Sequence, residues 1–157
     1  LKGEHGTVGQ MLEYGTASWE FDMVELDRLT NGHGLLSLGW AFFERFNLRS
    51  ALKVPSEVVL RFLSRVEEGY NPVSYHNSQH AGCVTHGVCW LLTSSNALKG
   101  ISSSPLDMIA AVLAALVHDL GHDGFNNKFH CATDSHLAVT YAYQSPLERH
   151  HLAGAFN

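Results

Sequence analysis

Apolar residues recur at intervals of three and four positions through most of the chain, a pattern typical of helices that bury one face. The clearest run has its apolar positions at Leu35, Leu38, Phe42 and Phe46. A second helix is predicted to begin at Pro55, because proline tolerates the first helical turn, and to end at Gly69. The apolar face of this second helix comprises Val58, Val59, Phe62, Leu63 and Val66.

The same spacing predicts further helices over Trp19–Leu29, Tyr75–Leu92, Leu106–Leu120, Ser135–Tyr141 and Leu147–Phe156. A break is expected at residues 94–96, Ser104 is a candidate N-cap, and Gly121 and Gly124 mark a turn. No run alternates apolar and polar residues over a length typical of a strand. The sequence therefore predicts an all-α fold: a compact multi-helix domain over residues 19–157, preceded by a flexible lead-in over residues 1–18.

The composition is that of a folded protein of ordinary domain size. Of 157 residues, 45% are hydrophobic and 16% are charged, which excludes a disordered chain. The formal net charge is −5 and no block of Lys and Arg occurs, so binding of nucleic acid through its phosphates is excluded. We expect small molecules or other proteins as partners, including a homodimer formed through regions outside this sequence.

The cysteines and the hydropathy pattern bear on the compartment. Three cysteines without a CxxC pair favour free thiols in a reducing environment, and we expect an intracellular, cytoplasmic protein. The most apolar stretch, residues 106–117, is shorter than the roughly 20 residues that span a bilayer. Membrane association through other segments stays open. Because the chain lacks an initiator methionine, we expect it to be part of a longer protein.

Histidine is the compositional anomaly. The chain has 11 histidines, nine of them between His76 and His151. Histidine is the commonest metal ligand and the usual acid or base at neutral pH. His76 and His80 lie four residues apart, which places both imidazoles on one face of the predicted helix. A pair at this spacing also occurs without any shared function, so that interpretation stays open.

A His-Asp pair at the end of the most apolar predicted helix points to a metal site. Burying the carboxylate of Asp119 costs several kcal/mol unless it is paired or holds a metal. One histidine of the first segment, the His118-Asp119 pair and the downstream Glu148 together supply nitrogen and oxygen ligands that suit zinc and a harder second ion, magnesium or manganese. The glycine turn would bring His122 back beside this site. Taken singly, the His-Asp pair could be structural and Glu148 could be a capping acid.

Three segments together identify a family. They read Tyr75-His76-Asn77-x-x-His80-Ala81, His118-Asp119-x-x-His122-x-Gly124-x-x-Asn127 and Ser145-Pro146-Leu147-Glu148-x-His150-His151. In this order they resemble the motifs of the class I 3′,5′-cyclic-nucleotide phosphodiesterases, a branch of the HD superfamily. The resemblance covers roughly residues 19–157 and is most specific in the second half.

The resemblance implies a function and a role for each matching residue. It implies hydrolysis of cyclic AMP, cyclic GMP or both to the 5′-monophosphate by a hydroxide that bridges two metals, zinc and magnesium or manganese. His80, His118 and Asp119 would bind the tight metal, with Asp119 bridging to the second. His76 would be the general acid. The supporting positions, near the metals' waters and the phosphate, would be His122, Glu148, Asn127 and Tyr75.

The chain also departs from the family pattern. The family's fourth metal ligand, an Asp, and its purine-binding Gln and Phe would lie beyond residue 157, so we expect the chain alone to be inactive. Cys83 stands where the family has Asp, and is expected to be a small buried residue. Ala142-Tyr143 stands in place of Asn-Asp. These departures keep open a degenerate regulatory domain without catalysis. Another HD-type phosphohydrolase is the second alternative, because such proteins need only the His-Asp core.

Overall fold

The computed structural model describes residues 7–94 and 104–157, and this part of the chain is entirely helical, without a strand. The all-α prediction is confirmed. Ten helices occur in the described part: α1 (Val8–Gly15), α2 (Met23–Leu29), α3 (Gly34–Arg45), α4 (Leu48–Leu52), α5 (Ser56–Glu68), α6 (Ser78–Ser94), α7 (Pro105–Val117), α8 (Asn127–Ala132), α9 (His136–Thr140) and α10 (Pro146–Ala155). None of these helices is long and apolar enough to cross a membrane.

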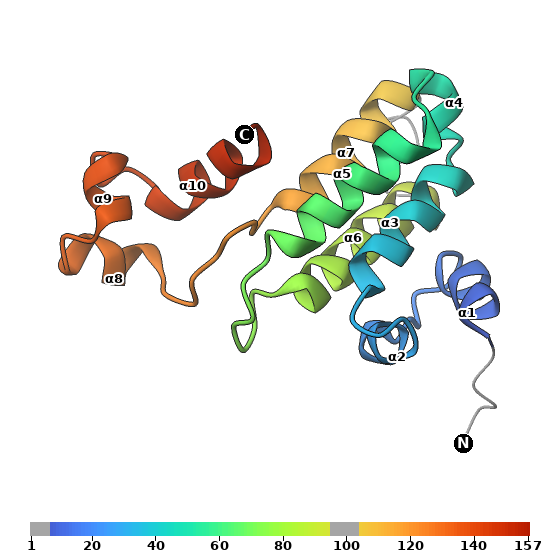
Figure 1. Cartoon of the computed structure of the whole chain (residues 1–157), viewed down its shortest axis with the longest axis horizontal. Coiled ribbons are helices and arrows are strands. Elements are labelled where there is room, and N and C mark those ends of the chain that lie inside the picture. The colour runs from blue at the N-terminus through green and yellow to red at the C-terminus, as the bar shows by residue number, and fades with distance from the viewer. Residues whose placement is uncertain (1–6, 95–103) are drawn as a thin grey trace.

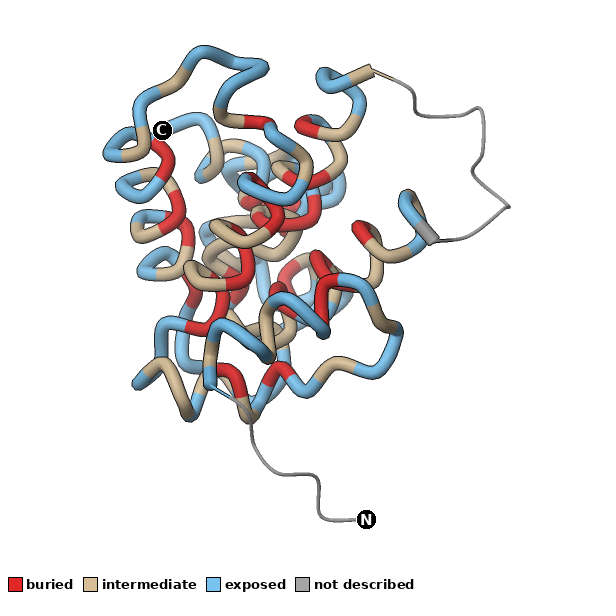
Figure 2. Tube along the Cα trace, turned by 90° about the vertical axis from the view of Figure 1, so that its right-hand side faces the viewer, coloured by how far each residue is buried: buried red, intermediate tan, exposed pale blue. Residues whose placement is uncertain are grey.

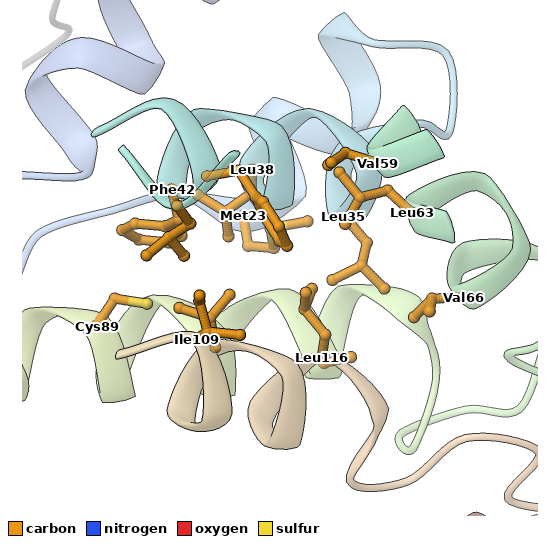
Figure 3. Close-up of a cluster of buried hydrophobic side chains, with 14 of the residues drawn as sticks. Met23, Leu35, Leu38, Phe42, Val59, Leu63, Val66, Cys89, Ile109 and Leu116 are labelled. Atoms are coloured by element: carbon orange, nitrogen blue, oxygen red, sulfur yellow. The ribbon is translucent and has the colours of Figure 1, made fainter. Parts of the chain in front are cut away.

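Helices α3, α5, α6 and α7 form a bundle around the main core (Figure 1). Their inward side chains meet between the helices, where Leu38, Leu63 and Leu116 are almost inaccessible to solvent (Figure 3). The buried positions follow the helical spacing seen in the sequence, and they line the inner faces of the bundle (Figure 2). Burial of these apolar faces drives the packing and holds the ends of α6 and α7 in fixed positions.

Several predicted helix ends agree with the structure. Ser104 caps α7, since its side chain accepts a hydrogen bond from the backbone N–H of Asp107. Gly69 ends α5 as expected. The predicted apolar face of α5 was too wide, because Val59, Leu63 and Val66 are buried whereas Val58 is 49% exposed. The break expected at residues 94–96 falls largely outside the described residues.

Helix α6 begins at Ser78 rather than at Tyr75, so the prediction that His76 and His80 share a face of one helix is wrong. The reason is Asn77, whose Oδ1 accepts a hydrogen bond from the backbone N–H of His80 at 3.1 Å. Its amide also donates to the carbonyl of Val73 at 2.9 Å. A short polar side chain competes in this way for backbone groups and starts the helix after itself.

Sequence reasoning missed three short helices, α1, α4 and α8. Helix α1 lies inside the expected flexible lead-in, and Thr7 and Gln10 form a capping box at its start. It is held to α6 by His86, whose Nε2 lies 2.9 Å from the carbonyl oxygens of both Gly15 and Ser18. A helix therefore replaces part of the expected loose segment, while the domain boundary at residue 19 stays a prediction.

Helix α2 is shorter than the predicted helix over Trp19–Leu29. Asp22 caps it by accepting a hydrogen bond from the backbone N–H of Glu25 at 2.9 Å. The aromatic residues before the cap pack on α6 instead, where Trp19 contacts Trp90 edge-on and Phe21 stacks on His86. Their apolar character reflects this docking and not a helical face.

The last three helices extend away from the bundle (Figure 1). A connecting segment, residues 118–126, links the end of α7 to the start of α8 and carries the His-Asp motif. The chain then turns back through α9, and α10 contacts α7, α8 and α9. Side chains from three separate sequence motifs can therefore meet where this segment leaves the bundle.

Ala142 and Tyr143 adopt left-handed backbone conformations, with φ of 52° and 59°. This conformation costs about 1–2 kcal/mol for most L-residues, whereas Gly and Asn adopt it readily. Replacing Ala142 with glycine or asparagine is expected to raise the free energy of unfolding by about 0.5–1 kcal/mol, which urea denaturation measures. Ala110→Gly, in the exposed middle of α7, is the matched control and is expected to lower it by a similar amount. A loss of stability in both Ala142 variants would contradict the assigned strain.

Candidate metal centre

The three predicted metal ligands, His80, His118 and Asp119, meet between the start of α6 and the end of α7. Nε2 of His80 lies 3.4 Å from Oδ2 of Asp119, and Nε2 of His118 lies 3.2 Å from the same oxygen. The two Nε2 atoms are 3.3 Å apart. The three side chains could hold one metal ion, since these ligand atoms lie within 4.8 Å of one another.

The spacing fits a tetrahedral metal. Ligand atoms about 2.0–2.1 Å from a tetrahedral zinc lie roughly 3.3 Å from each other. The orientation of His118 also fits, because its Nδ1 lies 2.9 Å from the carbonyl oxygen of Ala115 and must donate to it. Its Nε2 therefore keeps a lone pair, which faces the other two ligands.

Burial shapes the protonation of this group. All three side chains are partly buried. Loss of solvent, followed by the nearby His118, lowers the pKa of His80 below its ordinary value. A metal binds only the neutral imidazole, so the lowered pKa favours the form that can bind.

A second pair of histidines lies beside this trio. The rings of His76 and His122 stack with centroids 4.0 Å apart and an angle of 13° between their planes. Nδ1 of His122 accepts a hydrogen bond from the backbone N–H of Gly124 at 2.9 Å. Neutral His122 therefore carries its proton on Nε2, which makes that atom a hydrogen-bond donor. Burial and the stacked His76 lower the pKa of His122, which keeps it neutral.

The predicted glycine turn gives the connecting segment its shape. Gly121 and Gly124 have φ of 74° and 91°, in the region that favours glycine. The turn is tied to the end of α5, because the Gly121 N–H donates to the Gly69 carbonyl at 3.1 Å. The amide of Asn71 also donates to the carbonyl oxygens of Gly121 and His122. These bonds fix the backbone between Asp119 and His122.

Asn127 joins the second motif to the third. Its amide nitrogen lies 3.1 and 2.9 Å from the two carboxylate oxygens of Glu148 and donates to them. Its Oδ1 accepts a hydrogen bond from the Leu147 N–H at 3.0 Å. The bond from Asn127 lowers the pKa of Glu148, so the side chain is held as an anion. Asn127 thus orients the acid.

Tyr75 lies against both histidines of the first motif. Its ring centroid is 4.8 Å from that of His76 and 4.6 Å from that of His80. The side chain is largely exposed. Tyr75 therefore borders the site and limits the space open to these two imidazoles.

Sequence reasoning missed His151. This buried side chain donates from Nδ1 to the carbonyl oxygen of Leu120 at 2.7 Å, and its Nε2 lies 3.7 Å from Oδ1 of Asp119. Burial is the main cause of its lowered pKa. The signal was present in the sequence, since residues three apart on a helix share a face and His151 follows Glu148 by three.

Other candidate residues lie apart from this group. Cys83 is exposed, so the expectation of a small buried side chain was wrong. His86 and His130 are buried and hydrogen-bonded elsewhere, and His136 is exposed, as expected for histidines outside the site.

Comparison with known proteins decides the family. The family model described as 3′5′-cyclic nucleotide phosphodiesterase matches residues 75–157. The chain belongs to this family. The match includes all three motifs and every residue predicted for the site.

Relatives give the extent of the similarity. The chain is 33% identical over 143 residues to the probable 3′,5′-cyclic phosphodiesterase pde-1 of Caenorhabditis elegans, covering 88% of the chain and 21% of that protein. It is 34% identical over 139 residues to the human high affinity cAMP-specific and IBMX-insensitive 3′,5′-cyclic phosphodiesterase 8A, covering 88% of the chain and 16% of that protein. The chain thus spans about a fifth of the length of these curated relatives.

A solved structure shows the same fold. The phosphodiesterase domain of the RhoPDE fusion protein from the choanoflagellate Salpingoeca rosetta matches with a TM-score of 0.81 and 29% identity. The match covers 95% of this chain and 45% of that one. The helical arrangement described above is therefore that of part of a phosphodiesterase domain.

Proposed function

We propose that this chain carries part of the active site of an enzyme that hydrolyses a 3′,5′-cyclic nucleotide to the 5′-monophosphate. The observation that carries the proposal is the tetrahedral spacing of His80, His118 and Asp119 beside the stacked His76 and His122. A phosphodiester carries a negative charge and resists attack by water, so its hydrolysis needs both charge neutralisation and proton transfer. The first group would neutralise charge by holding a metal, and the stacked histidines would transfer the proton.

His80, His118 and Asp119 would hold the first metal, for which zinc is the best match to two imidazoles and one carboxylate. Oδ2 of Asp119 faces the two histidines of this trio and Oδ1 faces His151, so Asp119 would also help to hold a second ion, magnesium or manganese. When bound, the two ions would neutralise the phosphate and make water nucleophilic at neutral pH.

His76 would act as the general acid. Its stacked neighbour His122 stays neutral, so a proton on His76 meets no second positive charge across the stack. In the reaction a bond forms between phosphorus and a water oxygen, and the bond from phosphorus to O3′ breaks. O3′ takes the proton from His76, and the proton that the water loses passes to solvent.

His122 and Glu148 would hold the water and the phosphate by opposite means. His122 donates from Nε2, because its Nδ1 is occupied by Gly124. Glu148 accepts, because Asn127 keeps it ionised. A donor and an acceptor fixed beside the metal ligands orient the attacking water without rearrangement, which lowers the barrier.

Hydrolysis of cyclic AMP and cyclic GMP tests the proposal. We expect a protein extended to the length of the solved phosphodiesterase domain to turn over at least one of them, to lose activity in EDTA and to recover it with zinc and magnesium. We expect the 157-residue chain alone to show little or no turnover, because it covers only 45% of the solved phosphodiesterase domain.

The result also separates the alternatives. A folded, metal-loaded protein that turns over neither cyclic nucleotide would contradict the proposal and favour a regulatory domain without catalysis. Hydrolysis of simple phosphate esters without hydrolysis of either cyclic nucleotide would favour another HD-type phosphohydrolase. Both outcomes are read with the same purified protein, with thermal unfolding as the check that it is folded.

A further inference from the structure

Asp123, His130 and Ser135 form a chain of hydrogen bonds, called the relay below. It begins directly after His122. Oδ1 of Asp123 accepts a hydrogen bond from the backbone N–H of Phe125 at 3.1 Å. The same oxygen lies 3.2 Å from Nε2 of His130 on α8. The Asp123 side chain therefore closes a turn around Gly124 and ties that turn to α8.

His130 is only 2% exposed, and both of its ring nitrogens have partners. A carboxylate only accepts, so Nε2 of His130 donates to Asp123 and Nδ1 of the neutral ring must accept. Its partner at Nδ1 is Oγ of Ser135 at 2.8 Å, whose hydroxyl therefore donates. The same hydroxyl accepts from the Ala138 N–H at 3.2 Å as the N-cap of α9.

The Ser135, His130 and Asp123 set shares its residue types with a hydrolytic triad but lacks a free nucleophile. The hydroxyl of Ser135 donates to His130 and also caps α9, so both roles hold it in place. Every polar atom of the buried imidazole is satisfied, which is the mark of a rigid structural network. The set therefore fixes neighbouring groups and performs no chemistry of its own.

The group that it fixes is the imidazole of His122. The Gly124 N–H that binds Nδ1 of His122 lies inside the turn that the Asp123 carboxylate closes by accepting the Phe125 N–H. We propose that His130 is a positioning residue: through Asp123 it holds the Gly124 N–H in place and so keeps the proton of His122 on Nε2. This inference rests on the proposed role of His122 as a donor to water or phosphate.

Two substitutions at position 130 divide the relay. The amide of His130→Gln reaches the position of Nε2, so it can still donate to Asp123. It loses the hydrogen bond from the Ser135 hydroxyl. The amide of His130→Asn reaches only the position of Nδ1. It therefore keeps the hydrogen bond from Ser135 and loses the hydrogen bond to Asp123. A residue that merely fills the core would tolerate both amides equally, whereas a positioning residue requires the glutamine.

The first readout is the tautomer of His122, measured in the 157-residue chain by nitrogen NMR of the histidine rings above neutral pH. His122→Gln identifies the signals. We expect the wild type and His130→Gln to show one tautomer with the proton on Nε2. His130→Asn and Asp123→Ala are expected to show averaged nitrogen shifts. The readout needs no turnover, so it stands even if the proposed function fails.

The second readout is kinetic and uses the longer protein. His130→Asn is expected to lower kcat about 10-fold with KM within about twofold, because loss of an outer support of this kind costs roughly 10–100-fold. His130→Gln is expected to have the kcat of the wild type. Zinc content is expected to be the same in the wild type and both variants. A single His122 tautomer in both His130→Asn and Asp123→Ala would overturn the proposal. Since Asp123 is partly exposed, its variant keeps the test open if the buried position tolerates no change.

Discussion

Replacing Asp119 with alanine is expected to remove tightly bound zinc and to abolish cyclic-nucleotide hydrolysis in the extended protein. Oδ2 of Asp119 faces Nε2 of both His80 and His118, so within this trio the variant keeps the two imidazoles and loses the carboxylate. Zinc binding of about 10–16 kcal/mol over four ligands amounts to roughly 3 kcal/mol for each, or on the order of 100-fold in affinity. Elemental analysis after dialysis and calorimetric titration with zinc measure the loss.

A matched control separates a lost ligand from a lost charge. Glu57→Ala removes an exposed carboxylate from the first turn of α5 and is expected to bind zinc as the wild type does. Circular dichroism establishes that both variants remain helical. If Asp119→Ala keeps zinc with unchanged affinity, the trio is not the tight metal site and the role assigned to Asp119 is wrong.

The sequence predicted the residues of this site better than the local structure around them. His80, His118 and Asp119 were recognisable because an acid and imidazoles at the end of an apolar helix require partners. Their spacing of 3.2–3.4 Å depends on how α6 crosses α7, which is a property of tertiary packing. No pattern within either segment contains that information.

The error at His76 has the same origin. Tyr75–Asn77 continues a helical spacing, yet the Asn77 side chain accepts the backbone N–H of His80 in the first turn of α6 and leaves His76 outside the helix. His76 then meets His122 by stacking, a contact across 46 residues of sequence that periodicity cannot reveal. The family motif contains both residues, but only the structure shows how they meet.

The supporting contacts were the least predictable part. Asn127 and Glu148 were recognised as separate motif positions, whereas their hydrogen bonds arise from the way α10 packs against α8. His151 reaches Asp119 for the same reason, because the turn of α9 brings α10 back toward the end of α7. Residues that orient others carry weak sequence signals, since their chemistry depends on a partner far along the chain.

Replacing His76 with alanine is expected to leave zinc in place and to lower kcat for a cyclic nucleotide by about 100- to 10,000-fold, the usual contribution of a general acid. The ribose O3′ is a poor leaving group and needs a proton as its bond to phosphorus breaks. A 4-nitrophenyl phosphodiester needs none, because nitrophenolate is stable as an anion. The loss for that substrate is therefore expected to stay below about 10-fold.

The role of His76 is identified by the ratio of two losses in kcat, one for the cyclic nucleotide and one for the 4-nitrophenyl phosphodiester. His136→Ala removes an exposed imidazole that is not part of the trio and is expected to change neither rate nor zinc content. Equal losses on both substrates would mean that His76 orients the phosphate or supports His122 through the stack and does not donate the proton. Loss of zinc would instead make His76 a ligand, although it stacks on His122 and its neighbours already provide the tetrahedral spacing. A large ratio with full zinc content requires proton donation, because a positioning defect would affect both leaving groups alike.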